Sequence, residues 1–456
     1  MIPESAELAD VSGLASTGFE ATAETTGRWV VTFAEAGDGA DHAATLRSVG
    51  LASVASSLDF DGQVVDIAQT DAGEAVVFAE LGVAVVSGDS SRVSAMQSSA
   101  GGAIVSVEPE YVHHVLQGSG GNEYVTGYRD GVTDLSARLL AGADAGASVA
   151  REGVTQLFQD NAQFTWGLQA AGVSSSPFSG AGVKVAVLDT GFNFNHPDFV
   201  GRNITSQSFV PGVATAEDGH GHGTHCIGTS CGPKNPPSGV RRYGCAYEAD
   251  IFVGKVLSDQ GSGNDAGILA GINWAVANRT EVISMSLGAD VPQVSQAYET
   301  VGRRALNGGC LIVAAAGNNA HRDQPSLPPD QRFGFVGMPA NSPSIMAVAA
   351  LDEQLDTAVF SARSLTGVRG GNVDIAGPGV RVFSAWNQPR PEQGNQKYRS
   401  ISGTSMATPH AAGIAALWCQ ARGRKGRDLW TTLTQRAERL PLPSVDAGCG
   451  LVQAPL

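Results

Sequence analysis

Three segments of the sequence carry side chains that together could activate a hydroxyl group for attack on a carbonyl carbon. Asp189 ends the apolar run VKVAVLD, His222 lies in DGHGHGTHCIGT, and Ser405 lies in SGTSMATPHAAG. A serine hydroxyl is a weak nucleophile until a base removes its proton, and histidine is the usual base near neutral pH. A buried carboxylate can hold that histidine in the required tautomer. These residue types therefore indicate acyl-transfer chemistry.

Each segment has a plainer interpretation when it is taken alone. An aspartate after a strand often caps the following turn. His220, His222 and His225 form an HxHxxH pattern that could suggest zinc, but neither an HExxH motif nor an evident further ligand accompanies it. We therefore expect no metal at these histidines, and we expect His410 to be a packing residue.

The elements that must position these side chains alternate between strands and helices from Gln163 onward. The runs typical of buried strands are VKVAVLD, DIFVGKVL, VISMSL, CLIVAAAG and IMAVAAL. The helical segments are GTHCIGTS, DAGILAGINWAVANR, QVSQAYETVGRRALNGG and TPHAAGIAALWCQA. This alternation predicts an α/β domain over residues 161–456, with a mostly parallel central sheet covered by helices on both faces. Ligand-binding groups are then expected at the carboxyl ends of the strands.

The N-terminal part of the chain divides into three stretches by composition. Residues 1–26 are small and polar and are expected to form a flexible lead. Residues 27–116 are expected to contain, in order, strand RWVVTF, helix DHAATLRSVG, strands QVVDIAQ and EAVVFAE, helix SSRVSAMQSSAGG and strand AIVSVEP. That order predicts a small α+β ferredoxin-like domain. Residues 117–160 are rich in Gly, Ser, Ala and Asp and are expected to be a linker that holds at most one helix.

Bulk properties exclude several classes of protein. The 456 residues exceed one ordinary core, so two or more domains are expected. The net charge of −15, without a basic run, offers nucleic acid no electrostatic grip. No apolar run reaches the ~18 residues that a membrane span needs. The N-terminus lacks the basic and apolar regions of a signal peptide, so either the protein stays inside the cell or its leader lies outside the printed sequence.

The six cysteines all lie in the C-terminal two thirds of the chain. None belongs to a CxxC pair, so a structural zinc site is not expected. Six cysteines allow one, two or three disulfides, and the sequence alone does not choose the pairing. Cys231 and Cys245 bracket a single loop and are one candidate pair.

Taken together, in the order Asp, His, Ser, the three segments resemble the subtilisin family of serine proteases. The resemblance covers residues 163–453, and it is also carried by KVLSDQGSGNDAGILAGINWAVANRTEVISMSLG, LIVAAAGNN, VGMPANSPSIMAVAALD and GTSMATPHAAGIAAL. It implies a subtilisin-like three-layer fold and a serine endopeptidase. In that chemistry Ser405 is the nucleophile, His222 is the base and then the acid, and Asp189 orients the imidazole.

The resemblance also assigns the remaining parts of the site. Asn318 in AAAGNN and the Ser405 backbone N–H would stabilise the oxyanion. Substrate would pair in an extended conformation with two segments, and a further segment would close the pocket for the P1 side chain, the residue before the cut bond. Gly337 near the base of that pocket would leave room for a large apolar P1 side chain. The substrate-binding residues implied are Ser286, Leu287, Gly288, Gly261, Ser262, Gly263, Ala315, Ala316, Gly317 and Gly337.

The resemblance also implies a calcium ligand and a free thiol. Asp198 in NHPDF matches a calcium ligand of the family, but Asn235 is the one obvious oxygen donor in the loop that would supply most of the others. A structural calcium is therefore an open expectation, and the chemistry requires no cofactor. Cys226 resembles a free thiol that packs beneath the histidine, and we expect it to be inert.

Residues 105–116, VSVEPEYVHHVL, resemble the end of the inhibitory propeptide of such proteases, whose tail lies in the substrate cleft. The resemblance implies a zymogen that cuts itself between residues 117 and 160, acts on proteins or peptides, and is secreted or periplasmic. An unrelated small α+β domain is the alternative for residues 27–116. For the whole chain two other functions stay open: a latent binding protein held shut by its propeptide, and a peptide ligase or cyclase that passes the acyl group to an amine.

Overall fold

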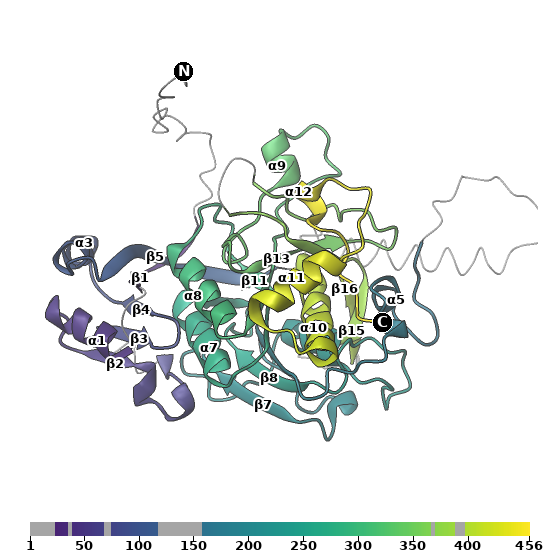
Figure 1. Cartoon of the computed structure of the whole chain (residues 1–456), viewed down its shortest axis with the longest axis horizontal. Helices are drawn as coiled ribbons and strands as arrows, with labels where there is room; N and C mark the ends of the chain where they lie inside the picture. Colours follow the sequence, from purple (N-terminus) through teal and green to yellow (C-terminus); the bar gives the residue numbers. More distant parts are fainter. Residues whose placement is uncertain (1–22, 35–38, 68–73, 117–156, 366–369, 388–396) are drawn as a thin grey trace, which may run out of the picture.

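A computed structural model describes residues 23–34, 39–67, 74–116, 157–365, 370–387 and 397–456 (Figure 1). Residues 1–22 of the predicted lead and residues 117–156 of the predicted linker, with its one candidate helix, lie outside the described residues. At the end of the predicted lead, Thr25 and Thr26 already belong to the first strand of the N-terminal unit. The described residues form a small N-terminal α+β unit, in purple and blue, beside a larger α/β domain (Figure 1).

The central sheet of the larger domain has seven strands within the described residues. Their order is β14, β13, β12, β10, β6, β8, β7, and every neighbouring pair is parallel, which confirms the predicted parallel sheet. The inner strands are largely apolar because helices bury both of their faces, whereas the edge strand β7 is polar and partly exposed. The strands are β6 (Lys184–Asp189), β7 (Ile204–Ser208), β8 (Asp250–Lys255), β10 (Val282–Met285), β12 (Leu311–Ala315), β13 (Met346–Leu351) and β14 (Ile375–Pro378).

Helices on the two faces of this sheet give the domain three layers. Ile283 and Met285 of β10 lie in one core with α7 and α8, whereas Val282 lies in a second core with α6 and α10. The alternation of side chains along each strand therefore feeds two separate cores. The helices are α5 (Trp166–Ala170), α6 (His222–Cys231), α7 (Asp265–Ala277), α8 (Gln296–Asn307), α9 (Pro329–Phe333), α10 (Thr404–Arg422), α11 (Gly426–Arg436) and α12 (Ser444–Ala447), with 3-10 turns η3 (Val173–Ser175) and η4 (Pro197–Phe199).

Short strands lie outside the central sheet. β15 (Val382–Ala385) and β16 (Tyr398–Ile401) form an antiparallel pair beside α6. β9 (Ser262–Asn264) precedes α7, and β11 (Leu287–Gly288) follows β10. β9 and β11 both pair with a strand of the N-terminal unit, so the two units share backbone hydrogen bonds.

The N-terminal unit is a sheet in the order β5, β1, β4, β3, β2. Its helices α1 and α3 contribute residues to a core of their own, and the opposite face, with Val76, Phe78 and Val83, packs into the core of α7 and α8. The elements are β1 (Thr25–Phe33), α1 (Gly39–Ser48), β2 (Val54–Ser56), η1 (Ser57–Asp59), η2 (Asp61–Gln63), β3 (Ala75–Phe78), β4 (Val83–Val86), α3 (Ser90–Ser99) and β5 (Ile104–Val115).

The strand predicted at QVVDIAQ is wrong. Gln63 ends a 3-10 turn, and the residues after it form no strand as far as they are described. Val65 and Ile67 are nevertheless buried, because this stretch packs into the core that contains α7. The two longer strands between α1 and α3 in the sequence are instead β3, which is the predicted EAVVFAE, and β4, which was not predicted. With β2 as a short extra edge strand, the strand–helix order otherwise follows the prediction.

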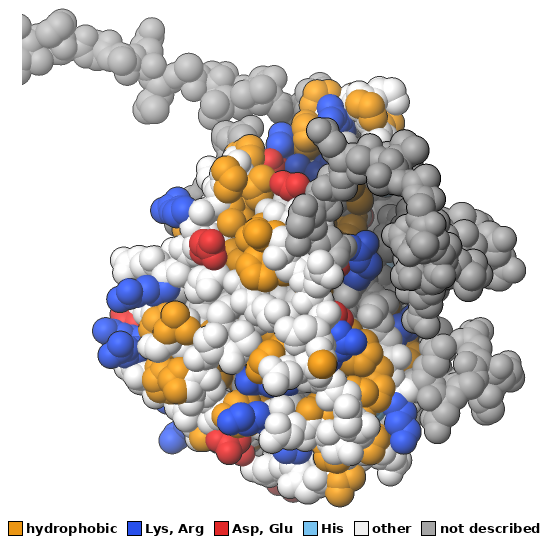
Figure 2. All heavy atoms as spheres, turned by 90° about the vertical axis from the view of Figure 1, so that its right-hand side faces the viewer, with side chains coloured by type: hydrophobic (Ala, Val, Ile, Leu, Met, Phe, Trp, Pro, Cys, Tyr) orange, Lys and Arg blue, Asp and Glu red, His pale blue; other side chains and the backbone are white. Residues whose placement is uncertain are grey.

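The outer surface of the larger domain is mixed in character. Figure 2 shows, on the face that it presents, Lys and Arg side chains in several separate groups among neutral ones. Within the described ranges, no helix combines the length and the apolar character needed to cross a bilayer.

Candidate active site

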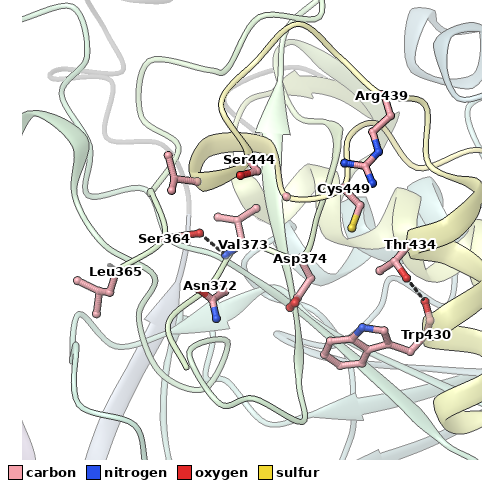
Figure 3. Close-up of a pocket in the computed structure, with 12 residues that line it drawn as sticks. Ser364, Leu365, Asn372, Val373, Asp374, Trp430, Thr434, Arg439, Ser444 and Cys449 are labelled. Carbon is pink, nitrogen blue, oxygen red and sulfur yellow. Dashed lines mark hydrogen bonds between the residues drawn. The ribbon is translucent and has the colours of Figure 1, made fainter. Parts of the chain in front are cut away.

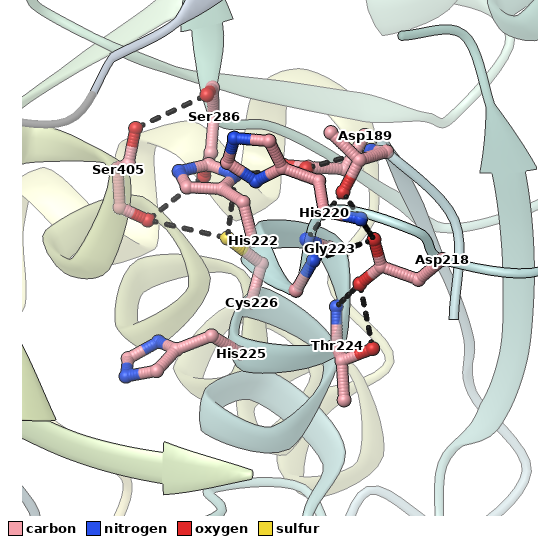
Figure 4. Close-up of polar contacts among 12 residues, drawn as sticks. Asp189, Asp218, His220, His222, Gly223, Thr224, His225, Cys226, Ser286 and Ser405 are labelled. Carbon is pink, nitrogen blue, oxygen red and sulfur yellow. Dashed lines mark hydrogen bonds and ion pairs between the residues drawn. The ribbon is translucent and has the colours of Figure 1, made fainter. Parts of the chain in front are cut away.

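Asp189 and His222 form a buried pair at the carboxyl end of β6 (Figure 4). The Asp189 Oδ1 atom lies 2.8 Å from His222 Nδ1 and also accepts a 2.7 Å hydrogen bond from the Thr190 backbone N–H. Both side chains are at most 1% exposed. A carboxylate at Nδ1 fixes the imidazole so that Nε2 is free to accept a proton.

Asp218 holds the start of α6, which carries His222. Its carboxylate accepts hydrogen bonds from the backbone N–H groups of Gly221 and Thr224 at 2.8 and 2.9 Å, and from the Thr224 hydroxyl at 2.7 Å. An anion at this position satisfies N–H groups that have no partner inside the helix. Asp218 is not among the residues predicted from the sequence; the signal that could have found it is an acidic residue four positions before the helix start.

Gly223 allows the close approach of α6 to the loop after β6. A Cβ atom at this position would lie 2.2 Å from the Gly191 carbonyl oxygen. No side chain fits there, so the glycine in HGTH is a packing requirement of the Asp189–His222 pair.

Ser405 lies in the first turn of α10, beside His222 (Figure 4). Its hydroxyl donates to the Leu116 carbonyl oxygen at 2.6 Å and lies 3.1 Å from the Ser286 carbonyl oxygen. His222 Nε2 has no hydrogen-bond partner among the described residues. The Ser405–His222 hydrogen bond is therefore not made in this state, in which the carbonyl of Leu116 engages the hydroxyl. Such bonds often tighten only as the reaction proceeds.

Asn318 supplies a donor to the same carbonyl oxygen. Its Nδ2 atom lies 2.5 Å from the Leu116 oxygen. The Asn318 Oδ1 atom accepts hydrogen bonds from the Thr404 backbone N–H at 3.0 Å and from the Thr404 hydroxyl at 2.9 Å. Thr404, which is not among the predicted site residues, thus turns the amide so that its NH₂ group faces the carbonyl oxygen.

Both predicted backbone segments hold the end of β5. β5 runs antiparallel to β9 and to β11, so its end lies extended between these two short strands. The Leu116 N–H donates to the Ser286 carbonyl at 3.4 Å, and the Val115 N–H donates to the Gly261 carbonyl at 2.9 Å. The remaining partners in register are Leu287 with Val115, Gly288 and Ser262 with His114, and Gly263 with His113.

Gly288 leaves space for the side chain of Leu116. A Cβ atom at Gly288 would lie 3.1 Å from Leu116 Cδ1, so a larger residue would press on this side chain. Ala315, Ala316 and Gly317 are buried at the end of β12, and the Gly337 N–H donates to the Ala316 carbonyl at 3.1 Å. These residues lie together as neighbours, and their role as the second wall of the pocket stays a prediction.

The three histidines of the HxHxxH pattern do not share a common ligand position. His222 is committed to Asp189, while His225 is buried with Nε2 2.9 Å from the Val382 carbonyl oxygen. Burial lowers the pKa of His225 to about 3, and burial also lowers the pKa of His220. His410 is likewise buried and bonded to the Met406 carbonyl at 2.8 Å, as a packing residue would be.

The Cys226 thiol lies beneath the imidazole. Its Sγ atom is 3.8 Å from His222 Nδ1 and 3.6 Å from the Ser405 carbonyl oxygen. Burial raises the pKa of this thiol well above its ordinary value, so it stays protonated at neutral pH. Asp189, His222 and Cys226 are the one group of potential metal ligands that lie close together in the described part of the chain, and the hydrogen bond to Asp189 already occupies Nδ1.

The expectation of calcium at Asp198 does not fit the contacts of this residue. The carboxylate accepts hydrogen bonds from the hydroxyls of Ser238 at 2.8 Å, Tyr243 at 2.7 Å and Tyr398 at 2.8 Å. Hydroxyl hydrogens fill the positions around the carboxylate where a cation would have to lie, and calcium needs about 6–8 oxygen ligands. Asp198 is instead the centre of a buried hydroxyl network.

The disulfide considered between Cys231 and Cys245 is not formed. Both are buried free thiols, as are Cys226, Cys310 and Cys419, and Cys449 is a partly exposed free thiol. Burial raises the pKa of Cys245 to about 12. The five buried cysteines therefore act as small apolar residues of the core.

A surface pocket of about 610 Å³ lies away from these residues, between α11, α12 and the start of β14 (Figure 3). Asp374 lines it at the amino end of β14, whereas the catalytic candidates lie at the carboxyl ends of strands. The pocket contains none of the predicted site residues. Burial raises the pKa of Asp374 to about 7. A hydrogen bond from the Ala347 N–H at 2.8 Å lowers the pKa but does not offset the effect of burial.

The geometry of this site is that of a serine hydrolase built on a parallel α/β sheet, and comparison with known proteins gives the same class. The sequence profile of the subtilase family matches residues 180–450, which is more than half of the chain. The chain belongs to the subtilase family, and its fold is that of a subtilisin-like protein.

Several curated proteases resemble the same region. Subtilisin Savinase of Lederbergia lenta is 38% identical over 256 residues, which is 55% of this chain and 82% of the relative. M-protease of Shouchella clausii is also 38% identical over 256 residues, 55% of this chain and 58% of its own. Subtilisin E of Bacillus subtilis is 37% identical over 251 residues, 55% of this chain and 58% of its own. The chain thus matches less than two thirds of the length of the last two.

Replacing Thr404 by Val should lower kcat by about tenfold, less than the 10²–10³ typical of losing an oxyanion donor outright. The Asn318 amide would lose the hydroxyl that orients it but keep the backbone N–H of residue 404. Thr408→Val is the matched control, since the Thr408 hydroxyl donates only to the Thr404 carbonyl one turn earlier. Steady-state kinetics on a peptide substrate measure the effect. Equal losses in both variants, or a change confined to KM, would contradict the positioning role.

The raised pKa of Asp374 predicts a pH-dependent stability. The unfolded carboxyl ionises near its usual pKa of about 4, whereas the folded one stays protonated up to about pH 7, so the free energy of unfolding should fall between these values as pH rises. In a Ser405→Ala background, which avoids self-digestion, Asp374→Asn should raise the free energy of unfolding by about 1–3 kcal/mol at pH 8 and hardly change it at pH 4. Urea unfolding at both pH values tests this, and an equal effect at both would disprove the assignment.

Proposed function

We propose that this protein is a serine endopeptidase made as a self-processing zymogen. One observation carries the proposal. The Leu116 carbonyl oxygen lies within hydrogen-bond distance of both Ser405 Oγ and Asn318 Nδ2, at the end of a backbone held extended between β9 and β11. This is how a peptide bond is presented to a serine nucleophile, with the Leu116–Gln117 bond as the one to be cut.

The reaction follows from the positions of these groups. His222 Nε2 removes the hydroxyl proton of Ser405 as Oγ attacks the carbonyl carbon of residue 116. The negative charge that develops on the carbonyl oxygen is stabilised by Asn318, and Asp189 stabilises the imidazolium. His222 then gives the proton to the leaving nitrogen of residue 117, which leaves an acyl-enzyme ester on Ser405. Water, activated by the same imidazole, hydrolyses the ester.

In this proposal residues 27–116 are an inhibitory propeptide that fills its own enzyme's cleft. Residues 161–456 are the peptidase domain, residues 117–160 the linker that begins at the cut, and residues 1–26 the lead. Propeptide carboxylates also reach the starts of two helices of the peptidase domain: Glu110 accepts from the Ala266 N–H of α7 at 2.9 Å, and Glu108 accepts from the Gln296 N–H of α8 at 2.7 Å. These contacts support docking in one orientation.

The proposed partners are protein or peptide substrates and the chain's own propeptide. The residues named above carry out the chemistry with side chains alone, so no cofactor is invoked. The large apolar P1 preference expected from Gly337 agrees with Leu116 at that position. A secreted or periplasmic location stays a prediction from the resemblance.

A fluorophosphonate probe should label the purified protein, and Ser405→Ala should not be labelled. N-terminal sequencing of the wild type should give a new end at Gln117, and the Ser405→Ala chain should remain intact. An uncut and unreactive wild-type chain would refute the proposal and favour the latent binding protein. If added amines were captured at Leu116 in preference to water, the ligase or cyclase would be favoured instead.

Glu110→Gln should shorten the delay before activity appears in the self-cleaved protein, by about fivefold or more, because a charge at the start of α7 and its ion pair with Arg28 are lost. Asp41→Asn is the control, since Asp41 is exposed on α1, which packs on the other face of the propeptide sheet. The measurement is the time course of hydrolysis of a small peptide substrate after processing. Identical delays in the two variants would show that Glu110 does not hold the propeptide in place.

A further inference from the structure

The register of β5 shows which of its residues occupies each substrate position of the cleft. Because the Leu116 carbonyl faces Ser405, Leu116 occupies the first subsite, S1. Counting back along the extended backbone, Val115 is at P2, His114 at P3 and His113 at P4. His113 pairs in register with Gly263 of β9, so its side chain marks the fourth subsite, S4.

The wall of S4 carries a buried acid at the start of α7. Asp265 is 2% exposed, and its Oδ1 atom lies 2.6 Å from Nε2 of His113, whose side chain is fully buried. The Tyr298 hydroxyl of α8 donates to the same oxygen at 2.7 Å, and the rings of His113 and Tyr298 meet edge to face. The other oxygen, Oδ2, accepts from the Tyr111 backbone N–H at 2.7 Å. The carboxylate thus takes two of these three donors from the chain in the cleft.

The charged groups of this region belong to different units of the chain. Arg28, Glu108 and Glu110 belong to the propeptide and leave with it. Asp265 stays with the peptidase domain, where it retains the Tyr298 hydroxyl. Burial raises the pKa of Tyr298 well above its usual value, with a further contribution from Asp265, so this hydroxyl remains a donor. A carboxylate in such a position is costly to desolvate again unless the next occupant brings a donor.

We propose that Asp265 makes the S4 subsite selective for substrates with a P4 side chain that carries a nitrogen donor: histidine, lysine or arginine. An apolar P4 side chain would cover the carboxylate without pairing it, and an acidic one would repel it. This inference rests on the proposed endopeptidase function and names its substrate class: peptides with a basic residue at P4 and a large apolar residue, such as leucine, at P1.

The test uses the complete chain, expressed and allowed to process itself, with coumarin amides of the form acetyl-Xaa-Ala-Val-Leu. For the wild type, kcat/KM with His or Lys at Xaa should exceed that with Phe or Glu by at least about tenfold, the scale expected when a buried charge is left unpaired. Acetyl-Ala-Val-Leu, which lacks P4, gives the reference rate for each protein. The ratio between substrates is the readout, so a variant with a lower absolute rate is still informative.

Asp265→Leu should reverse the preference, with Phe above Lys at P4. Tyr298→Phe is the matched control, because it removes the neighbouring hydroxyl but keeps the carboxylate, and it should keep the preference for basic P4 residues. If Asp265→Leu does not mature, the double variant Asp265→Leu with His113→Phe restores an apolar pair at the contact and carries the same test.

The outcomes separate the two proposals. If the substrates with Phe or Glu at P4 are hydrolysed as fast as those with His or Lys, the S4 assignment is overturned and the endopeptidase function stands. An unchanged ratio in Asp265→Leu would overturn it as well, and would mean that Asp265 serves only the contact with His113. Failure to hydrolyse even acetyl-Ala-Val-Leu would overturn the endopeptidase function itself.

Discussion

The antiparallel clamp of β9 and β11 on β5 is the constraint on which the site depends. Main-chain hydrogen bonds fix the register of the tail, and that register alone brings the Leu116 carbonyl to Ser405 and Asn318. Backbone pairing makes few demands on side chains, so it can serve many sequences. Selectivity must then come from the walls of the cleft, where Gly288 leaves space for the side chain of Leu116 and the carboxylate of Asp265 contacts His113.

The ends of helices do much of the positioning. α6, α7, α8 and α10 begin near the cleft, at the carboxyl-end side of the parallel sheet, where N–H groups without helical partners accumulate. Asp218 satisfies those of α6, and Glu110 and Glu108 of the N-terminal unit reach those of α7 and α8. The same physical feature thus orients His222 and holds the N-terminal unit against the larger domain.

The sequence predicted the central sheet because apolar runs report burial directly. It also singled out the catalytic candidates, because the three motifs are local. It failed where pairing or partners are distant. QVVDIAQ has the apolar pattern of a strand, and Val65 and Ile67 are buried, but none of its described residues pairs with a strand. The sequence suggested Asp198 as a cation ligand, but the hydroxyl of Tyr398, 200 residues away in the sequence, donates a hydrogen bond to its carboxylate. Burial can be inferred from composition, whereas the identity of a long-range partner cannot.

β5 belongs to the sheet of the N-terminal unit and to the pairing with β9 and β11 at the same time. Its end cannot leave the cleft by a small movement, because the residues before it are strands and core of the N-terminal unit itself. In the proposed zymogen, breaking the covalent bond would therefore not by itself open the cleft. The lag before activity would be set by how long the N-terminal unit stays folded and bound, so the stability of this unit would time the activation.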